Sequence, residues 1–405
     1  MANTFTSVVR QHWEKAPQAY LEKYSVAMEL ATMKVVPDGT VLNIPRVALN
    51  RTQSYTKYTD VTIADATTGS DTLTINTNAI ASFKLDYLDS EDNYISMTPE
   101  IGQRAGTMLR QRLDGDFLNQ ILNANTVYDN GGLRANTGTI TPIALTTGAS
   151  QNISTVFGGA QASLLDIGVM DSRLALVVDS YTVNTLNTLG LEVGFDVADR
   201  AYQEKVFKGY RGRFLGMEVY AAGCLTASTV LDMATNPTAN DYIYIKGVKF
   251  TFVSSIGTTA GNVLIGASAD ATRVNLETLI NAPETTTANG VALDAFDLAK
   301  LEGVTAVDSP SWDTLTLTSK RGQMSCVSSM TNASNDFQAE TLNCAIMEKG
   351  AIWVALRDNV KVIDRDEPKS FVTNYFWLTR YGITTPYAGK ERMVRIAIQS
   401  RSAEA

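Results

Sequence analysis

A polar interruption within an apolar chain is the feature of this sequence that most constrains its fold. The segment Arg211–Met233 begins as a strand with alternating apolar side chains and becomes polar after Cys224. A long stretch rich in Thr, Ala, Asn and Asp follows, and the apolar character returns at Cys344–Ile363. A domain that resumes after such a break carries an insertion in one of its loops, at a point where the two ends of the insertion lie close together.

The inserted segment, residues 226–339, has strand and helix patterns of its own. Alternating apolar residues on both sides of the Lys246-Gly247 turn predict a hairpin. Ser268 is a good N-cap for a helix over "ADATRVNLETLIN", and "WDTLTLTSKRG" predicts a final strand. Residues 228–338 hold eleven acidic and six basic side chains. We therefore expect a small acidic α+β domain.

The clearest helical pattern in the chain covers residues 98–123. Thr98 is a suitable N-cap and Pro99 suits the first helical position. At about 1.5 Å per residue the helix would be nearly 40 Å long, which suits a strut. Arg104, Arg110, Arg112 and Asp114 are expected mainly away from its apolar face. That face is predicted from residues that recur every three or four positions: Ile101, Ala105, Met108, Leu109, Leu113, Phe117 and Ile121.

Two segments before this helix have too little apolar surface to fold alone. Residues 1–45 contain two amphipathic stretches, which predict short helices that lie on another surface. Residues 41–88 contain two strand patterns around a Thr-rich stretch, which predict a long two-stranded hairpin. An ordinary hairpin at the edge of a sheet is the alternative. The second strand pattern alternates Leu73 and Ile75, and then Ile80 and Phe83.

An α/β pattern surrounds the insertion. A helix over "ISTVFGGAQASLLDIGV", a strand over "RLALVVDS", a helix over residues 181–189 and a strand over residues 214–221 precede it. A helix through "AETLNCAIMEKGAIWVAL" and strands around "YFWLTRYGIT" and "RMVRIAIQS" follow it. We expect these two halves to form one sheet-and-helix unit.

The sequence contains little that is typical of a catalytic site. His12 is the only histidine, and the nucleophile-elbow, P-loop and dinucleotide-binding glycine motifs do not occur. Cys224, Cys326 and Cys344 have no CxxC spacing, so neither a disulfide framework nor a zinc site is predicted. The chain is therefore predicted not to be an enzyme, with no catalytic residue, no cofactor and no metal.

Charge and hydropathy exclude two further classes. A net charge of -8 argues against general affinity for nucleic acid, which needs a cationic surface, although such a protein could still enclose DNA. No apolar run is long enough to cross a bilayer, and the N-terminus has no signal-peptide pattern, so we expect a cytoplasmic site of synthesis. The acidic stretch "DYLDSEDN" lacks the spacing of a calcium loop; a solvated or ion-pairing loop is the preferred interpretation over calcium binding.

The order of the predicted elements resembles that of a known family. The stretches "RLALVVDSYTVNTLNTL", "FKGYRGRFLGMEVYAAGCL" and "RYGITTPYAGKERMVRIAI", with the Tyr381-Gly382 pair, are similar to segments of major capsid (coat) proteins of tailed bacteriophages with the HK97 fold. The resemblance implies an α+β fold and the following domains: an N-terminal arm (1–40), an extended loop (41–80), a peripheral domain (81–149 and 363–405) with a spine helix (98–123), an axial domain (150–225 and 340–362) and an inserted domain (226–339).

The resemblance also implies a function. The chain would assemble with copies of itself into hexamers and pentamers of an icosahedral capsid, which forms in the host cytoplasm and encloses double-stranded DNA without sequence-specific binding. A separate scaffolding protein, a portal and a decoration protein are the implied partners. A tail or baseplate structural protein and the shell protein of a nanocompartment are the alternatives. Charged residues on and beside the hairpin are candidate intersubunit contacts: Arg46, Arg51, Lys57, Asp60, Asp86, Asp89, Glu91 and Asp92.

Overall fold

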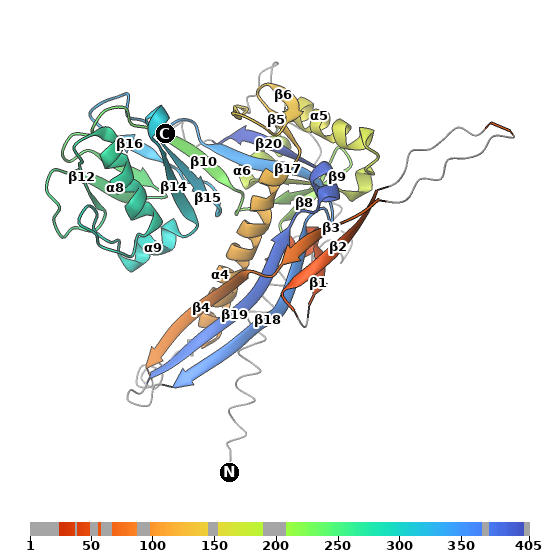
Figure 1. Cartoon of the computed structure of the whole chain (residues 1–405), viewed down its shortest axis with the longest axis horizontal. Helices are drawn as coiled ribbons and strands as arrows, with labels where there is room; N and C mark the ends of the chain where they lie inside the picture. The colour runs from red at the N-terminus through yellow and green to blue at the C-terminus, as the bar shows by residue number, and fades with distance from the viewer. Residues whose placement is uncertain are drawn as a thin grey trace, which may run out of the picture. The chain divides into compact units, whose positions relative to one another are not determined.

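The chain forms two compact units, each with its own sheet. The computed structural model describes residues 24–36, 39–48, 56–57, 67–86, 98–144, 153–188, 208–366 and 372–400. The first unit contains Leu30–Arg110 and Lys349–Glu391, and the second contains Tyr24–Glu29, Gln111–Glu348 and the segment from Arg392 onward. Many strands and fewer helices make up both units (Figure 1), which confirms the α+β class.

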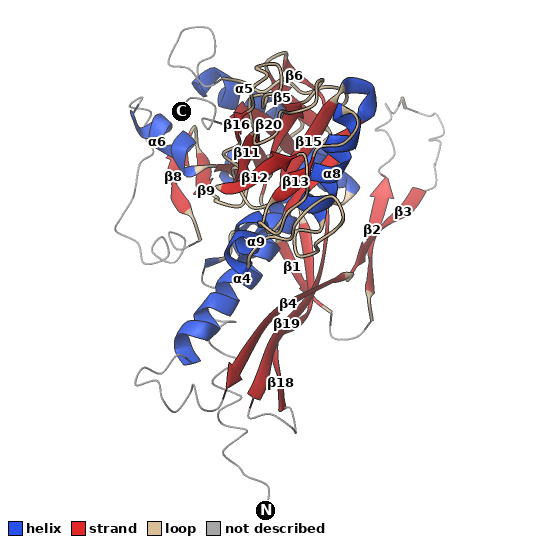
Figure 2. Cartoon of the chain, turned by 90° about the vertical axis from the view of Figure 1, so that its left-hand side faces the viewer, coloured by secondary structure: helices blue, strands red, loops and turns tan. Residues whose placement is uncertain are grey.

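The first unit is built on a four-stranded sheet of order β1-β18-β19-β4 (Figure 2). β1 is parallel to β18, and the other neighbours are antiparallel. The amphipathic pattern before residue 36 predicts helix, and most of that segment lies outside the described residues. Within the described part, Tyr24 and α2 (Ala27–Leu30) are helical, whereas Thr32–Val35 form β1 because they complete the edge of this sheet. The strands are β1 (Thr32–Val35), β4 (Thr77–Asp86), β18 (Trp353–Asp366) and β19 (Val372–Thr384), and the short helix α10 (Tyr387–Glu391) follows β19.

The predicted hairpin is present as a separate two-stranded sheet. β2 (Val41–Ala48) and β3 (Thr67–Thr74) pair antiparallel in continuous register. The strand pattern predicted to run through Ile80 and Phe83 instead ends at Thr74, and β4 then joins the four-stranded sheet. Within β4 the small residues Ala79 and Ala81 are buried, whereas Ile80 is 57% exposed, so the predicted apolar face is wrong there.

The predicted long helix is confirmed. α4 (Thr98–Asn119) continues into the 3₁₀ turn η1 (Gln120–Asn123), and the chain passes from the first unit to the second within it. Met108 is 48% exposed, at the margin of the predicted stripe. The other apolar positions whose side chains are described are buried: Ala105, Leu109, Leu113, Phe117 and Ile121.

The second unit is built on a ten-stranded sheet. Its main path has the order β14-β15-β10-β17-β20-β5-β6, and β7, β9 and β8 branch from β17. α5 (Ile153–Asp166) packs against β17 and β20, and α6 (Ser180–Thr188) follows β7. The strands outside the insertion are β5 (Thr126–Asp129), β6 (Gly132–Ala135), β7 (Leu174–Val178), β8 (Tyr210–Phe214), β9 (Met217–Ala221), β17 (Thr341–Glu348) and β20 (Met393–Gln399).

Two predictions about this sheet are wrong. The segment 339–356 was expected to be helical, but it forms β17 and the start of β18. Every residue of β17 after Thr341 is buried. A strand buried on both faces lacks the alternation of apolar and polar residues that distinguishes strands from helices. The predicted strand 214–221 is two strands, β8 and β9, because Leu215 and Gly216 both have positive φ and form a tight turn.

The insertion extends this sheet and adds a second one. β10 (Ala227–Asp232) pairs with β17 through Ala227↔Leu342 and Ser228↔Thr341, so the two ends of the insertion lie side by side, as predicted. Beyond β10 the sheet continues into β15 (Thr314–Ser319) and β14 (Val304–Ser309), at the opposite end of the path from β6 (Figure 1). β20 pairs with β17, although the resemblance placed residues 363–405 in the peripheral domain. The domain names stay predictions.

The second sheet of the insertion has the order β13-β12-β11-β16. The hairpin predicted at Lys246-Gly247 joins β11 to β12, and the predicted N-cap Ser268 accepts a hydrogen bond from the Ala271 N–H at 3.2 Å. Val274 of the predicted helix is 45% exposed, whereas Leu276, Leu279 and Ile280 are buried. The elements are β11 (Tyr242–Ile245), β12 (Val248–Val253), β13 (Asn262–Leu264), β16 (Val327–Ser329), α8 (Ala269–Asn281) and α9 (Ala295–Leu301).

Candidate intersubunit surfaces

The root of the β2–β3 hairpin has one docked face and one exposed face. Antiparallel register places Leu42 opposite Leu73 and Ile44 opposite Asp71, with all four side chains on one face. Ile44 and Leu73 are buried against Ala355 of β18. The core of the described part of the hairpin is therefore small and lies at the root.

Tyr387 contacts both strands of the hairpin. The Arg46 guanidinium carbon lies 4.7 Å from the centroid of the Tyr387 ring, and the Asp71 carboxylate accepts a hydrogen bond from the Tyr387 N–H at 3.0 Å. A Cβ atom on Gly69 would lie 3.2 Å from an Arg46 nitrogen, so the glycine leaves room for the guanidinium group. We call Arg46, Asp71 and Tyr387 the Tyr387 latch. Because Tyr387 is half exposed, each contact is worth about 1 kcal/mol or less.

A close backbone approach fixes the base of the same hairpin. A Cβ atom on Gly382 of β19 would lie 2.2 Å from the carbonyl oxygen of Thr74, closer than any side chain allows. The neighbouring Tyr381 is 1% exposed. The Tyr381-Gly382 pair singled out in the sequence thus combines a core residue with the residue that lets β3 approach β19.

In the described strands β2 and β3, the exposed face of the hairpin carries no charged side chain. Arg46 and Asp71, the charged residues of β2 and β3, both belong to the docked face. We call the opposite side the free face, and no described strand flanks either edge of it (Figure 2). Its exposed residues are Val41, Asn43, Pro45, Thr68, Ser70, Thr72 and Thr74.

The structure places few of the predicted contact residues. Arg46 lies on Tyr387 of its own chain, and Lys57 is exposed. Asp86 ends β4, and its side chain is outside the described residues. The role of these residues between subunits stays a prediction, and so does the interpretation of residues 86–93 as a solvated or ion-pairing loop. The remaining candidates lie outside the described residues: Arg51, Asp60, Asp89, Glu91 and Asp92.

The buried carboxylate of Asp114 holds the arm segment Tyr24–Glu29 in the second unit, although Asp114 is predicted on the polar side of the long helix. Asp114 is 4% exposed and accepts hydrogen bonds from the Ser25 hydroxyl at 2.6 Å and the Ala27 N–H at 3.0 Å. These bonds satisfy donors at the start of α2. The signal that could have revealed it is its position three residues before Phe117, within the apolar stripe.

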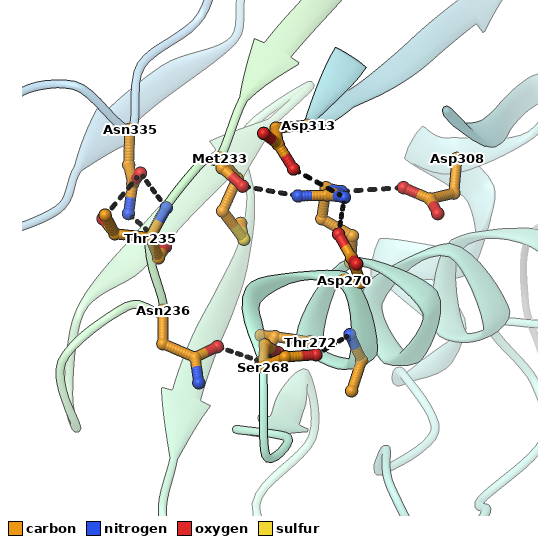
Figure 3. A network of polar contacts seen from close by, with 11 residues as sticks. Met233, Thr235, Asn236, Ser268, Asp270, Thr272, Asp308, Asp313 and Asn335 are labelled. Carbon is orange, nitrogen blue, oxygen red and sulfur yellow. Dashed lines mark hydrogen bonds and ion pairs between the residues drawn. The ribbon is translucent and has the colours of Figure 1, made fainter. Parts of the chain in front are cut away.

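A buried arginine organises the insertion, and sequence reasoning also missed it. Arg273 of α8 is fully buried, and its guanidinium group donates to the Met233 carbonyl at 2.5 Å and to Asp308 at 2.8 Å. It also pairs with Asp270 and, at 3.5 Å, with Asp313 (Figure 3). The network joins α8 to β14, through Asp308, and to the end of β10, through Met233. Such a residue looks like any exposed helical arginine in a sequence.

Burial shifts the pKa of three titratable groups in or beside the insertion, Lys246, Cys326 and Cys344. Burial raises the pKa of the Cys326 and Cys344 thiols, the opposite of what a nucleophilic thiolate needs. Burial also lowers the pKa of Lys246, whose Nζ donates to the Arg321 carbonyl at 3.0 Å. Within the described ranges, no group of three or more His, Cys, Asp or Glu side chains could hold a metal, and no helix is long and apolar enough to span a membrane.

The chain is similar to several phage capsid structures over most of its length. The match to the capsid of Ralstonia phage GP4 covers 94% of this chain and 91% of the other chain, with 10% sequence identity and a TM-score of 0.46. The match to the capsid of cyanophage P-SCSP1u covers 93% of this chain and 89% of the other, with 11% identity and a TM-score of 0.45. The match to the mature capsid of bacteriophage PhiM1 covers 92% of this chain and 87% of the other, with 11% identity and a TM-score of 0.44. No family model and no curated protein matches. At this identity and TM-score, the similarity assigns no role to any residue of this chain.

Proposed function

We propose that this chain is the major capsid protein of a tailed bacteriophage, which assembles with copies of itself into the hexamers and pentamers of a closed shell. The observation that carries the proposal is the β2–β3 hairpin, whose one face is docked on its own unit, while the free face of its described strands is uncharged and no described strand pairs with either edge. An open ribbon of this kind invites pairing with another chain, and natural proteins that stay monomeric usually blunt such edges with charges.

The order of elements supports the same proposal. A hairpin, a long helix, an α/β sheet with an insertion and two closing strands follow one another in the order that the sequence resemblance implies. A tail or baseplate protein built from repeated β-domains would lack the 22-residue helix α4 and the mixed sheet beside it. The capsid interpretation explains both a rigid helix and an open hairpin.

The proposal extends to location and partners. The shell would form in the host cytoplasm, become part of the virion and enclose double-stranded DNA without binding a particular sequence, in keeping with the net charge of -8. A separate scaffolding protein, a portal and a decoration protein are the proposed partners. The chemistry is structural, and no cofactor is required.

Electron microscopy of the purified protein, expressed alone and together with the products of its flanking genes, tests the proposal. Closed shells with hexameric and pentameric units are the expected result. Tubes or stacked rings would favour a tail component, and monodisperse small particles under every condition would overturn the proposal. Nuclease-protected DNA inside particles from infected cells would separate a capsid from a nanocompartment shell, which would assemble without DNA.

A further inference from the structure

Four apolar side chains are exposed at one corner of the second unit. They lie at the end of α5, in the following loop and in the β8–β9 turn. We call them the α5 corner patch: Leu165 (38% exposed), Ile167 (57%), Met170 (69%) and Leu215 (46%). Exposed apolar residues that gather in one place mark interaction surfaces more often than scattered ones do.

Hydrogen bonds hold the parts of the α5 corner patch together. The side-chain amide of Gln161, which is 8% exposed, donates to the Asp171 carboxylate at 2.7 Å and to the Leu215 carbonyl at 2.8 Å. Leu215 also approaches α5, since a Cβ atom on Gly158 would lie 3.7 Å from its Cδ1. The patch is therefore anchored to α5 and presented in a defined geometry.

The backbone of Leu215 is an independent sign that the patch has a role. Leu215 has a φ of 49°, in the left-handed region that Gly and Asn adopt readily and a leucine does not. The chain thus places a large apolar side chain, half exposed, where a glycine or an asparagine would relieve strain and improve solubility. Strain retained at a surface points to a function of the side chain there.

The charges around the patch indicate which partner it fits. Asp166 and Asp171 are exposed near the patch in sequence, and so are Arg173, Arg211 and Arg213. Arg173 pairs with Glu348 at 3.1 Å, so two acidic and two other basic side chains remain. This balance gives no net attraction for nucleic acid or for an anionic membrane, which both need an excess of cations. A surface with both signs is complementary to another copy of the same surface, or to a nearby surface of an identical subunit.

We propose that the α5 corner patch is part of the contact between neighbouring copies of this chain, a proposal that rests on the proposed function. A stable interface buries about 800 Å² on each partner, so four side chains make up only a part of it. Weakening the patch should therefore shift the concentration needed for assembly without unfolding the subunit.

Charged substitutions in the full-length protein test the proposal. Met170→Asp is expected to raise the protein concentration at which shells appear by about tenfold or more, measured by light scattering and electron microscopy. Leu133→Asp is the matched control, because Leu133 is 44% exposed on β6 of the same unit and lies outside the patch. Its threshold is expected to stay close to that of the unmodified protein.

A second variant separates assembly from folding. Leu215→Asn suits the positive φ, so thermal unfolding of the unassembled subunit should occur at the same or a higher temperature while the assembly threshold rises. The proposal is overturned if the Met170→Asp and Leu215→Asn proteins form shells at the same concentration as the unmodified protein. It is also overturned if Leu133→Asp raises the assembly threshold as much as Met170→Asp does. A third contrary result is that the variants form normal shells that have only lost an accessory protein. Unmodified protein that never forms shells would instead overturn the proposed function, and this proposal with it.

Discussion

The β2–β3 hairpin and the insertion both leave a sheet and return to it, yet they are stabilised in opposite ways. The insertion has its own interior, in which Phe250, Phe252 and Arg273 are fully buried. The described part of the hairpin has a root of two buried side chains, Ile44 and Leu73, and the half-exposed Tyr387 latch. An excursion with its own core can serve as a domain, whereas one without a core is completed by whatever its free face contacts.

Of the substitutions that test this comparison, Arg273→Met is expected to change the free energy of unfolding most. The substitution leaves the carboxylate of Asp308, 6% exposed, buried without its cation, so we expect the free energy of unfolding to fall by about 3–5 kcal/mol. Denaturant unfolding measures the loss, and hydrogen exchange should locate it in residues 227–340. Lys300→Met, which removes an exposed ion pair to Asp297, is the control and should change stability little. Equal stability of the two variants would contradict a core organised by Arg273.

Gly382→Ala should loosen the hairpin without affecting the insertion. The added methyl group would meet the Thr74 carbonyl, so β3 must move, at a cost of about 1–3 kcal/mol. Hydrogen exchange should quicken in β2 and β3 and stay unchanged in β11 and β12. Gly223→Ala is the control, since nothing lies within 4 Å of its added Cβ. Unchanged protection of β2 and β3 would show that the hairpin does not depend on this approach.

Asn281→Ala tests how the insertion closes its own sheet edge. The Asn281 amide donates to the Ala306 carbonyl and accepts from the Ala306 N–H, both at 2.9 Å, along the outer edge of β14. Removing it leaves two backbone groups unsatisfied, which should cost about 1–2 kcal/mol in thermal unfolding. Thr278→Ala, on an exposed site of the same helix, is the control. A loss no greater than the control's would mean that the edge needs no cap.

The smallest expected effect comes from the Tyr387 latch. Arg46→Ala and Tyr387→Leu should each lower stability by about 1 kcal/mol or less, and the double variant should lose less than the sum, because both remove the same contact. Denaturant unfolding of the four proteins gives the coupling, with Lys57→Ala as a surface control. Additive losses would show that Arg46 and Tyr387 act independently.

The sequence predicts elements whose signals are local. The Thr98 start of α4, the Lys246-Gly247 hairpin and the Ser268 cap depend on neighbours within a few residues, and all three are confirmed. The segment of β17 was mistaken for a helix because a strand covered on both faces shows no alternation, and only distant partners, β10, β7 and β20, determine its state.

The polar contacts of the candidate site were harder to predict. Arg273 has ordinary sequence surroundings, and the only local sign of Asp114 is its place within the apolar stripe. The burial of both side chains follows from partners that are distant in sequence, such as Ser25 and Asp308. The sequence shows that Arg46 is charged, but it does not show on which face of the hairpin Arg46 lies, because that depends on the register of β2 against β3. The exposed corner of α5 was not predicted at all.

The pairing of Ala227 with Leu342 has a consequence for how this chain can vary in length. The insertion leaves and rejoins the sheet between two hydrogen-bonded neighbours, so its ends are one strand spacing apart whatever lies between them. Loop-closure entropy grows only as the logarithm of the number of residues, at about 0.6 kcal/mol for each doubling. A segment much shorter or longer than this one could therefore occupy the same position with almost the same entropic penalty, which makes the position tolerant of exchange.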